Sequence, residues 1–273
     1  MTAPHPASER APLQDFPVTD ERAARIIGRE LLALLGASLL FPFGLRRSPR
    51  RTPRRAEQRT VVLVHGYLAN RGPLLPLAAY LHARGHKQIL AYEYSGAAGV
   101  EQAAIGLRKF LRTHVRGGRI DLVCHSLGGL VARVYLQQLG GARRVDRCIT
   151  LGTPHRGTHA AWVGRGKTAR QLRPGSLLLR QLARSSRAMP VRFISFYSNL
   201  DSLVLPASNA KITEPALRAR NVLVKDVGHL SLLISRPIIR AIAETLANPD
   251  VPNQLNLRPA RSVRNGARAQ SGA

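Results

Sequence analysis

The sequence predicts a doubly wound α/β fold built on a mostly parallel sheet of about six strands. Several short runs are apolar throughout, which is typical of strands buried on both faces of a parallel sheet. Helical patterns separate most of these runs, and such alternation implies right-handed crossovers. The expected strands are residues 60–65, 86–92, 120–124, 145–151, 191–197 and 221–224. The expected helices are residues 73–84, 100–115, 127–139 and 231–246.

The composition suits one globular domain with two basic extensions. The chain has 273 residues, 44% of them hydrophobic, and a formal net charge of +27. We expect residues 60–247 to form the domain, because that length can bury a full core. Residues 1–59 are expected to comprise a disordered segment (1–17), an apolar helix and an arginine-rich linker, and residues 248–273 a disordered basic tail.

The net charge and the scarcity of aromatic and metal-binding residues limit the classes of ligand that we expect. A large positive charge attracts anionic membrane surfaces, nucleic acid or acidic ligands, unless it only reflects codon bias in the source. No nucleic-acid-binding signature occurs and aromatic residues make up only 5%, so no specific nucleic-acid partner is expected. Cysteines and histidines do not occur in pairs at zinc spacing, so no metal or other cofactor is expected. Cys124 and Cys148 are expected to be small buried hydrophobic residues.

An apolar run near the N-terminus suggests a membrane contact. Residues 31–45 would form a helix about 22 Å long, shorter than a bilayer core of about 30 Å, and Pro42 would shorten it further. Residues 46–55 include six arginines. Residues 26–55 therefore predict a shallow anchor on an anionic membrane surface, or alternatively a helix packed on the domain before a solvated linker.

The same region carries the prediction of localisation. Its positive charge follows the apolar run instead of preceding it, which is unlike a cleavable signal peptide. We therefore expect a cytoplasmic protein, or one that is peripheral on the inner face of the cytoplasmic membrane.

The strand–helix alternation is interrupted at residues 158–190, which predict a helical lid. Leucines and basic residues alternate there, and no acidic residue occurs from Arg147 to Leu200. An apolar face could cover substrate while the basic face meets lipid phosphates, although an ordinary amphipathic helix would show the same pattern. The leucines expected to meet substrate are Leu177, Leu178 and Leu182.

Ser126 is the candidate nucleophile because it lies between an expected strand and an expected helix. The stretch Cys124-His-Ser-Leu-Gly128 has the strand–turn–helix context of a nucleophile elbow, usually spelled G-x-S-x-G. Cys124 replaces the first glycine, where a small side chain is needed. The helix that follows would offer free N–H groups and a positive dipole end.

A serine needs a base to take its proton and an acid to orient that base. In sheets of this type the acid and then the histidine follow the nucleophile. His229 is favoured over His155 and His159, because it follows the last strand and can reach back over the sheet.

The acid is expected to be Asp201, which follows the strand 191–197 and precedes His229. Asp226 is too near in sequence to support the histidine from the opposite side, and Glu214 is the third choice. An oxyanion hole needs two N–H donors. We expect them to be the amides of Leu127 and of Tyr67, with Leu68 as the second choice for the latter.

Several motifs in order carry a resemblance to a known family. They are His65-Gly-Tyr67 with Asn70, the elbow, Leu151-Gly-Thr-Pro-His-Arg-Gly-Thr158, Arg173-Pro-Gly-Ser-Leu177, Asp201-Ser-Leu-Val-Leu-Pro206 and Gly228-His-Leu-Ser-Leu-Leu233. Over residues 60–246 the chain resembles the α/β-hydrolase superfamily, in its bacterial triacylglycerol lipase/esterase type with GPI-inositol-deacylase-like relatives. The departures are Cys124, the unmatched residues 1–59, and the lack of an acidic cluster for the structural calcium of some relatives.

The resemblance implies hydrolysis of a hydrophobic carboxylic ester, such as an acyl lipid, through an acyl-enzyme on Ser126. Two alternatives stay open. One is an acyltransferase on the same scaffold, and the other is a catalytically inert protein that binds lipid or nucleic acid. The oligomeric state is also open.

Overall fold

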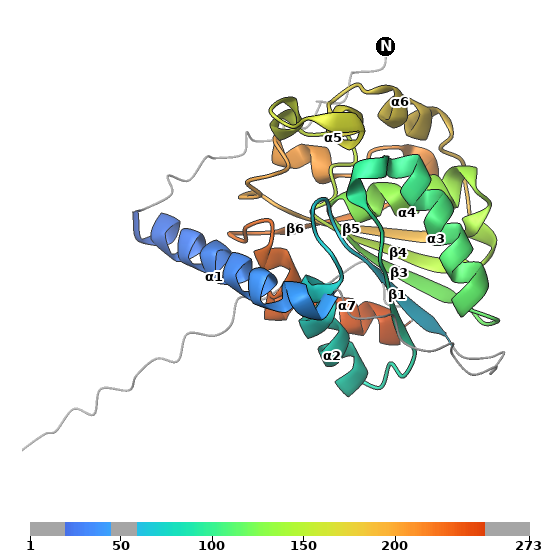
Figure 1. The fold of residues 1–273 in the computed structure, drawn as a ribbon, viewed down its shortest axis with the longest axis horizontal. Helices are drawn as coiled ribbons and strands as arrows, with labels where there is room; N and C mark the ends of the chain where they lie inside the picture. The colour runs from blue at the N-terminus through green and yellow to red at the C-terminus, as the bar shows by residue number, and fades with distance from the viewer. Residues whose placement is uncertain (1–19, 45–58, 249–273) are drawn as a thin grey trace, which may run out of the picture.

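The computed structural model describes residues 20–44 and 59–248, which are arranged around a central sheet (Figure 1). The sheet has six strands. The strand order is β2-β1-β3-β4-β5-β6, and every neighbouring pair is parallel. The expected α/β fold with about six parallel strands is confirmed. The strands are β1 Thr60–Val64, β2 Ile89–Tyr92, β3 Ile120–His125, β4 Val145–Leu151, β5 Arg192–Ser198 and β6 Arg220–Val224.

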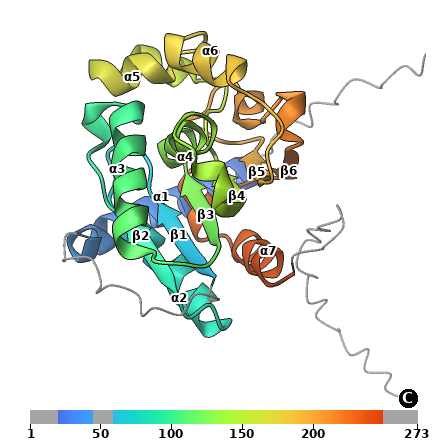
Figure 2. The same ribbon diagram turned by 90° about the vertical axis from the view of Figure 1, so that its right-hand side faces the viewer.

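Helices cover both faces of the sheet (Figure 2). One face carries α3 Val100–His114 and α4 Leu127–Gln138, with α5 Gly166–Leu172 and α6 Leu177–Arg184 beyond α4; the other carries α2 Leu75–Ala83 and α7 Arg236–Ala247. Val62 and Val64 belong to the first core cluster, whereas Val61 and Leu63 belong to the second. Both faces of β1 are therefore buried, which explains why its sequence is apolar without alternation.

The strand order reverses between β1 and β3, and this places the candidate site. The chain runs from β1 outward to β2 and then returns to the opposite side of β1 as β3, with Val64 paired to Cys124. At such a switch point the loops after two adjacent strands diverge and leave a crevice at their carboxyl ends. The loop of Tyr67 and the elbow of Ser126 are the two loops concerned.

Two expected elements begin later than predicted. Strand β2 starts at Ile89, because Gly85 has a φ of 92° and His86 still donates its amide to Leu81 at the end of α2. The last helix starts at Arg236, because Pro237 disfavours helical backbone before it and is tolerated only in a first turn. Residues Ser231–Leu233 form a separate 3₁₀ turn, η7.

Ahead of the sheet, helix α1 (Asp20–Gly44) continues through Pro42, so the expectation that this proline shortens it is wrong. Its last carbonyls at Phe41 and Gly44 are satisfied by side chains of the domain. By length and composition, Ile27–Gly44 could cross a membrane, with a mean hydropathy of 1.4. The predictions for residues 1–17, 46–55 and the tail after Asn248 lie outside the described residues.

Candidate active site

Ser126 occupies a strained bend between β3 and α4. Its φ of 52° and ψ of −123° lie in a region of backbone conformation that residues other than glycine rarely adopt. A β-carbon at Gly128 would come within 2.6 Å of the carbonyl oxygens of Val64 and His65, so only glycine lets α4 approach β1 this closely. The side chain of Ser126 is half-buried at the carboxyl end of β3.

Cys124, in the first position of the motif, is fully buried in the core. It and Cys148 are both free and buried, as expected. Burial, together with the neighbouring Cys148, raises the pKa of the Cys124 thiol well above its ordinary value. The thiol therefore serves as a packing group and not as a nucleophile.

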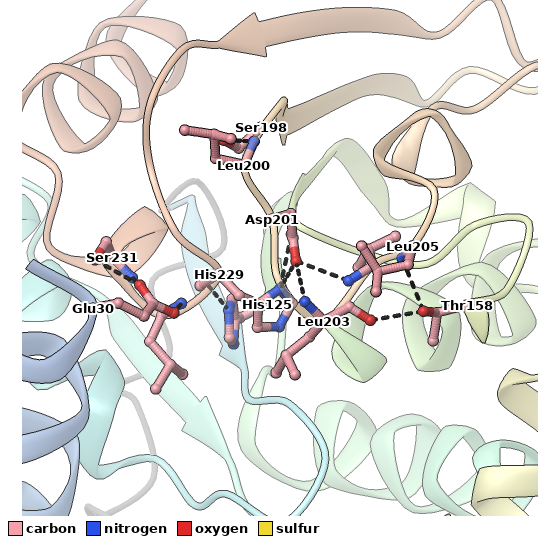
Figure 3. Close-up of polar contacts among 12 residues, drawn as sticks. Glu30, His125, Thr158, Ser198, Leu200, Asp201, Leu203, Leu205, His229 and Ser231 are labelled. Atoms are coloured by element: carbon pink, nitrogen blue, oxygen red, sulfur yellow. Dashed lines mark hydrogen bonds and ion pairs between the residues drawn. The ribbon is translucent and has the colours of Figure 1, made fainter. Parts of the chain in front are cut away.

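The structure brings Asp201 and His229 together, although 28 residues separate them (Figure 3). Nδ1 of His229 lies 2.9 and 2.8 Å from the two carboxylate oxygens of Asp201, so it donates to the carboxylate. Asp201 also accepts from the amides of Leu203 (2.9 Å) and Val204 (2.8 Å). Burial alone would raise the pKa of Asp201, but the bond from His229 and these amides outweigh it and lower the pKa. The acid is therefore ionised and aimed at the histidine.

Gly152, at the end of β4, leaves the room that this pair needs. A β-carbon there would lie 2.9 Å from Oδ2 of Asp201 and 3.1 Å from Nδ1 of His229, and the φ of Gly152 is 55°. The Leu-Gly-Thr-Pro stretch thus contributes a glycine beneath the acid–histidine pair.

His125, which the sequence analysis left without a role, joins the elbow to the histidine loop. Its Nε2 lies 3.2 Å from the carbonyl oxygen of His229, and the two rings are 4.8 Å apart. Burial lowers the pKa of His125 to about 3, so the ring is neutral and donates Nε2–H. Within the described residues the Ser126 hydroxyl has no hydrogen-bond partner. When no substrate is bound, hydrogen bonds of this kind are often long and shorten only in the complex with substrate.

The candidate oxyanion residues lie around one glycine. A β-carbon at Gly96 would meet the Tyr67 ring at 3.3 Å, the Leu68 amide at 3.6 Å and the Leu127 side chain at 3.7 Å. The loop after β1 and the start of α4 therefore adjoin each other. Leu68 has a φ of 52°, and strained backbone of this kind clusters at functional sites.

The rejected acids are engaged elsewhere in the structure. Glu214 lies 2.6 Å from Arg133, and the amide of Asp226 donates to Asn199 at 2.8 Å. Of the rejected histidines, His155 is buried with Nε2 3.0 Å from the Thr150 hydroxyl.

Two of the three leucines proposed to meet substrate instead pack the domain. Leu178 and Leu182 are 2% and 0% exposed and belong to the core cluster that contains α4, and Gln137 of α4 donates to the Leu182 carbonyl. Leu177 is 62% exposed and is the only one of the three that can offer an apolar surface. The helices of residues 158–190 are thus fastened to the domain through their apolar side.

Polar contacts at greater sequence distance complete the site. Thr158 donates to the Leu203 carbonyl at 2.7 Å and accepts from the Leu205 amide at 2.9 Å, which braces the loop of Asp201. Glu30 of α1 binds the residues directly after His229 (Figure 3). No local pattern marks Glu30, because its partners are about two hundred positions away.

Elsewhere in the described residues there is a further cavity but no metal-binding cluster. In residues 20–44 and 59–248, no group of three or more His, Cys, Asp or Glu side chains could hold a metal ion. A cavity of about 690 Å³, lined in part by Arg147, Arg192 and Arg220, lies at the amino-terminal ends of β4 to β6. That edge is opposite to the one carrying Ser126, Asp201 and His229.

Comparison with known proteins agrees with the fold. Residues 44–170 match the sequence model of a domain of unknown function (DUF7379). The mature lipase BlEst2 of Bacillus licheniformis superposes with a TM-score of 0.57 at 18% identity, over 71% of this chain and 95% of that one. Lipase B of Aspergillus fumigatus superposes with a TM-score of 0.63 at 16% identity, over 75% of this chain and 56% of that one. The carboxylesterase CesB of Bacillus subtilis superposes with a TM-score of 0.55 at 13% identity, over 85% of this chain and 100% of that one. The chain has the α/β-hydrolase fold.

In the α/β-hydrolase fold the nucleophile, acid and histidine come from loops at the carboxyl edge of the sheet. Ser126 follows β3, Asp201 follows β5 and His229 follows β6 in this chain. The fold therefore offers a place for each candidate group at one edge.

Proposed function

We propose that the protein is a serine hydrolase that cleaves carboxylic esters of hydrophobic acyl groups through an acyl-enzyme on Ser126. The observation that carries the proposal is the ionised Asp201 held 2.8 Å from Nδ1 of a buried His229, at the same sheet edge as the strained Ser126. The fold shared with lipases and a carboxylesterase supports the same reaction type.

The proposed reaction uses these groups in two half-reactions. The Ser126 oxygen attacks the ester carbonyl carbon while Nε2 of His229 takes the hydroxyl proton, and Asp201 stabilises the imidazolium that forms. The amides of Leu127 and Tyr67 stabilise the oxyanion. His229 then gives its proton to the departing alcohol, and a water activated by His229 hydrolyses the acyl-enzyme.

Exposed apolar side chains around the catalytic loops support a hydrophobic substrate. Leu68 is 78% exposed beside Tyr67, and Leu203 and Leu205 in the loop of Asp201 are 50% and 44% exposed. Large apolar side chains left exposed beside a candidate site favour an apolar ligand. The relationship to GPI-inositol-deacylase-like proteins remains part of this proposal.

Localisation is proposed from the sequence order alone. The arginines of residues 46–55 follow the apolar helix, so the domain would lie on the cytoplasmic side if the helix spanned a membrane; a peripheral protein would sit on the inner face of the cytoplasmic membrane.

The proposal is tested with a fluorophosphonate probe and p-nitrophenyl esters of increasing chain length. We expect the parent to be labelled and active, and Ser126→Ala to lose labelling and at least about 10⁴-fold in kcat. Ser208→Ala, which changes an exposed serine outside the site, is the matched control and should keep both. A parent that resists the probe and a broad ester panel would indicate an inert binding protein. Transfer of the acyl group to added alcohols in preference to water would indicate an acyltransferase.

A further inference from the structure

Helix α1 is fastened to the loop that carries the candidate catalytic histidine. The carboxylate of Glu30 accepts hydrogen bonds from the amide of Leu230 at 2.7 Å, the amide of Ser231 at 3.1 Å and the hydroxyl of Ser231 at 2.7 Å. A β-carbon at Gly228 would overlap this carboxylate, so the loop is shaped to receive it. Both residues bonded to Glu30 directly follow His229.

A second attachment lies near the C-terminal end of the helix. Asn70 donates to the Phe41 carbonyl at 2.8 Å, and Nε of Arg71 donates to the Gly44 carbonyl at 3.1 Å. A β-carbon at Gly72 would overlap the carbonyl of Leu40. Asn70 and Arg71 belong to the loop after β1, which also carries Tyr67.

These attachments hold the helix along the domain (Figure 1). Glu30 and Phe41 are about 16 Å apart at 1.5 Å per residue, so α1 is tied at two separated points. A narrow stripe at helical spacing faces the domain, in which Ala33 and Gly44 are buried and Glu30, Ala37 and Leu40 are partly buried.

From Ile27 to Phe43, most of the remaining helix surface is apolar and exposed, apart from Arg29 and Ser38. At about 100° per residue, its large side chains cover roughly 200° of the circumference. They are Ile27, Leu31, Leu32, Leu34, Leu35, Leu39, Phe41 and Phe43, each between 42% and 74% exposed. A helix on a water-facing surface would carry polar residues there, so this face is suited to an apolar partner.

We propose that the partner is an anionic lipid surface, on which α1 lies in the membrane plane while Glu30 holds the loop of His229 beside it. Charge complementarity selects this partner, because six arginines follow α1 within residues 46–55 and the chain carries a net charge of +27. An amphipathic helix binds such a surface through buried apolar area plus attraction to anionic headgroups. This proposal rests on the proposed function only for the role of the site at the membrane, because vesicle binding is measured without turnover.

The test uses the full chain with Ser126→Ala, so that vesicles are not consumed. Vesicles of phosphatidylcholine with and without phosphatidylglycerol are sedimented, and bound protein is quantified. We expect binding that needs phosphatidylglycerol, and a drop of about tenfold or more in the partition coefficient for Leu35→Glu with Leu39→Glu. Ile105→Glu on α3, where the side chain is 41% exposed, is the matched control and should bind like the parent. Circular dichroism checks that each variant is folded.

Two outcomes would overturn the proposal. One is unchanged vesicle binding by the paired glutamate variant. The other is a dimer of the parent in vesicle-free solution that the glutamates convert to a monomer, because a second copy would then cover the apolar face. Ester hydrolysis by the parent is assayed separately, so a failure of the proposed function would not be mistaken for a failure of binding.

Discussion

At the residue scale, the site depends on small residues that let larger groups meet. Gly128 brings α4 against β1, and Gly152 lies beneath the Asp201–His229 pair. Cys124 stands where the usual motif has another glycine, and the core accommodates it, because its side chain is fully buried in the cluster shared with α4. The strained backbone of Ser126 is held by hydrogen bonds: its amide donates to the Leu151 carbonyl at 2.9 Å, and its carbonyl accepts from the Gly129 amide at 3.1 Å.

We predict that Gly152→Ala lowers kcat by about 10²-fold or more, because misplacing a catalytic pair by about 1 Å has that cost. The added methyl group would lie 2.9 Å from the Asp201 carboxylate. Steady-state kinetics on a soluble short-chain ester measure the effect, and Gly85→Ala controls for strain at positive φ, since its β-carbon meets nothing within 4 Å. Equal kcat values for the two variants would contradict the role given to Gly152.

Cys124→Gly should keep turnover within a few-fold of the parent while lowering the free energy of unfolding by about 1–2 kcal/mol, from a small cavity and a more flexible backbone. Urea unfolding and ester kinetics measure the two effects. A large loss of kcat with little loss of stability would mean that the thiol itself contributes to the reaction.

At the scale of elements, distant segments brace the loops of Asp201 and His229. Thr158 holds the loop of Asp201, and His125 of β3 bonds the carbonyl of His229. Glu30 of α1 bonds the two residues after the histidine. The histidine loop is thus held from the elbow on one side and from α1 on the other.

Removing the α1 contact should affect catalysis through His229. We expect Glu30→Ala to lower kcat about tenfold on a soluble ester with little change in KM, because losing partly buried hydrogen bonds to a carboxylate, at about 1–3 kcal/mol, loosens the loop. Glu30→Gln should have a kcat between those of the parent and Glu30→Ala, since its carbonyl oxygen can still accept a hydrogen bond from the Leu230 amide. Glu244→Ala, on the exposed side of α7, is the control. A purely structural role would instead lower stability without this ordering of kcat values.

At the scale of the whole molecule, two buried histidines make stability depend on pH. Burial lowers the pKa of His125 to about 3, and burial followed by the charge of Arg133 lowers the pKa of His155 well below 6.5. Both rings are neutral in the folded state, whereas the unfolded chain binds their protons near pH 6.5. Their contribution is therefore present above pH 6.5 and lost as pH falls below it.

Between about pH 6.5 and pH 5, each histidine should reduce the free energy of unfolding by about 1.4 kcal/mol per pH unit. Denaturant unfolding over this range measures the slope. His155→Gln should reduce it by up to about half, and Ser208→Ala, an exposed change at a residue that does not titrate in this range, should leave it unaltered. A slope that His155→Gln does not change would contradict this account.

The sequence by itself determined the fold class and the six strands, because apolar periodicity is a local property of the chain. It also determined the choice of Ser126, Asp201 and His229 as candidates, because the order of the motifs can be followed along the chain. The tertiary structure decided which partners brace them. It brought Glu30 to residues some two hundred positions away and placed His125 on the carbonyl of His229. It also buried Leu178 and Leu182 in the core instead of leaving them to a substrate. Long-range pairing depends on how faces pack, and a leucine at helical spacing looks the same whether it covers a core or a ligand.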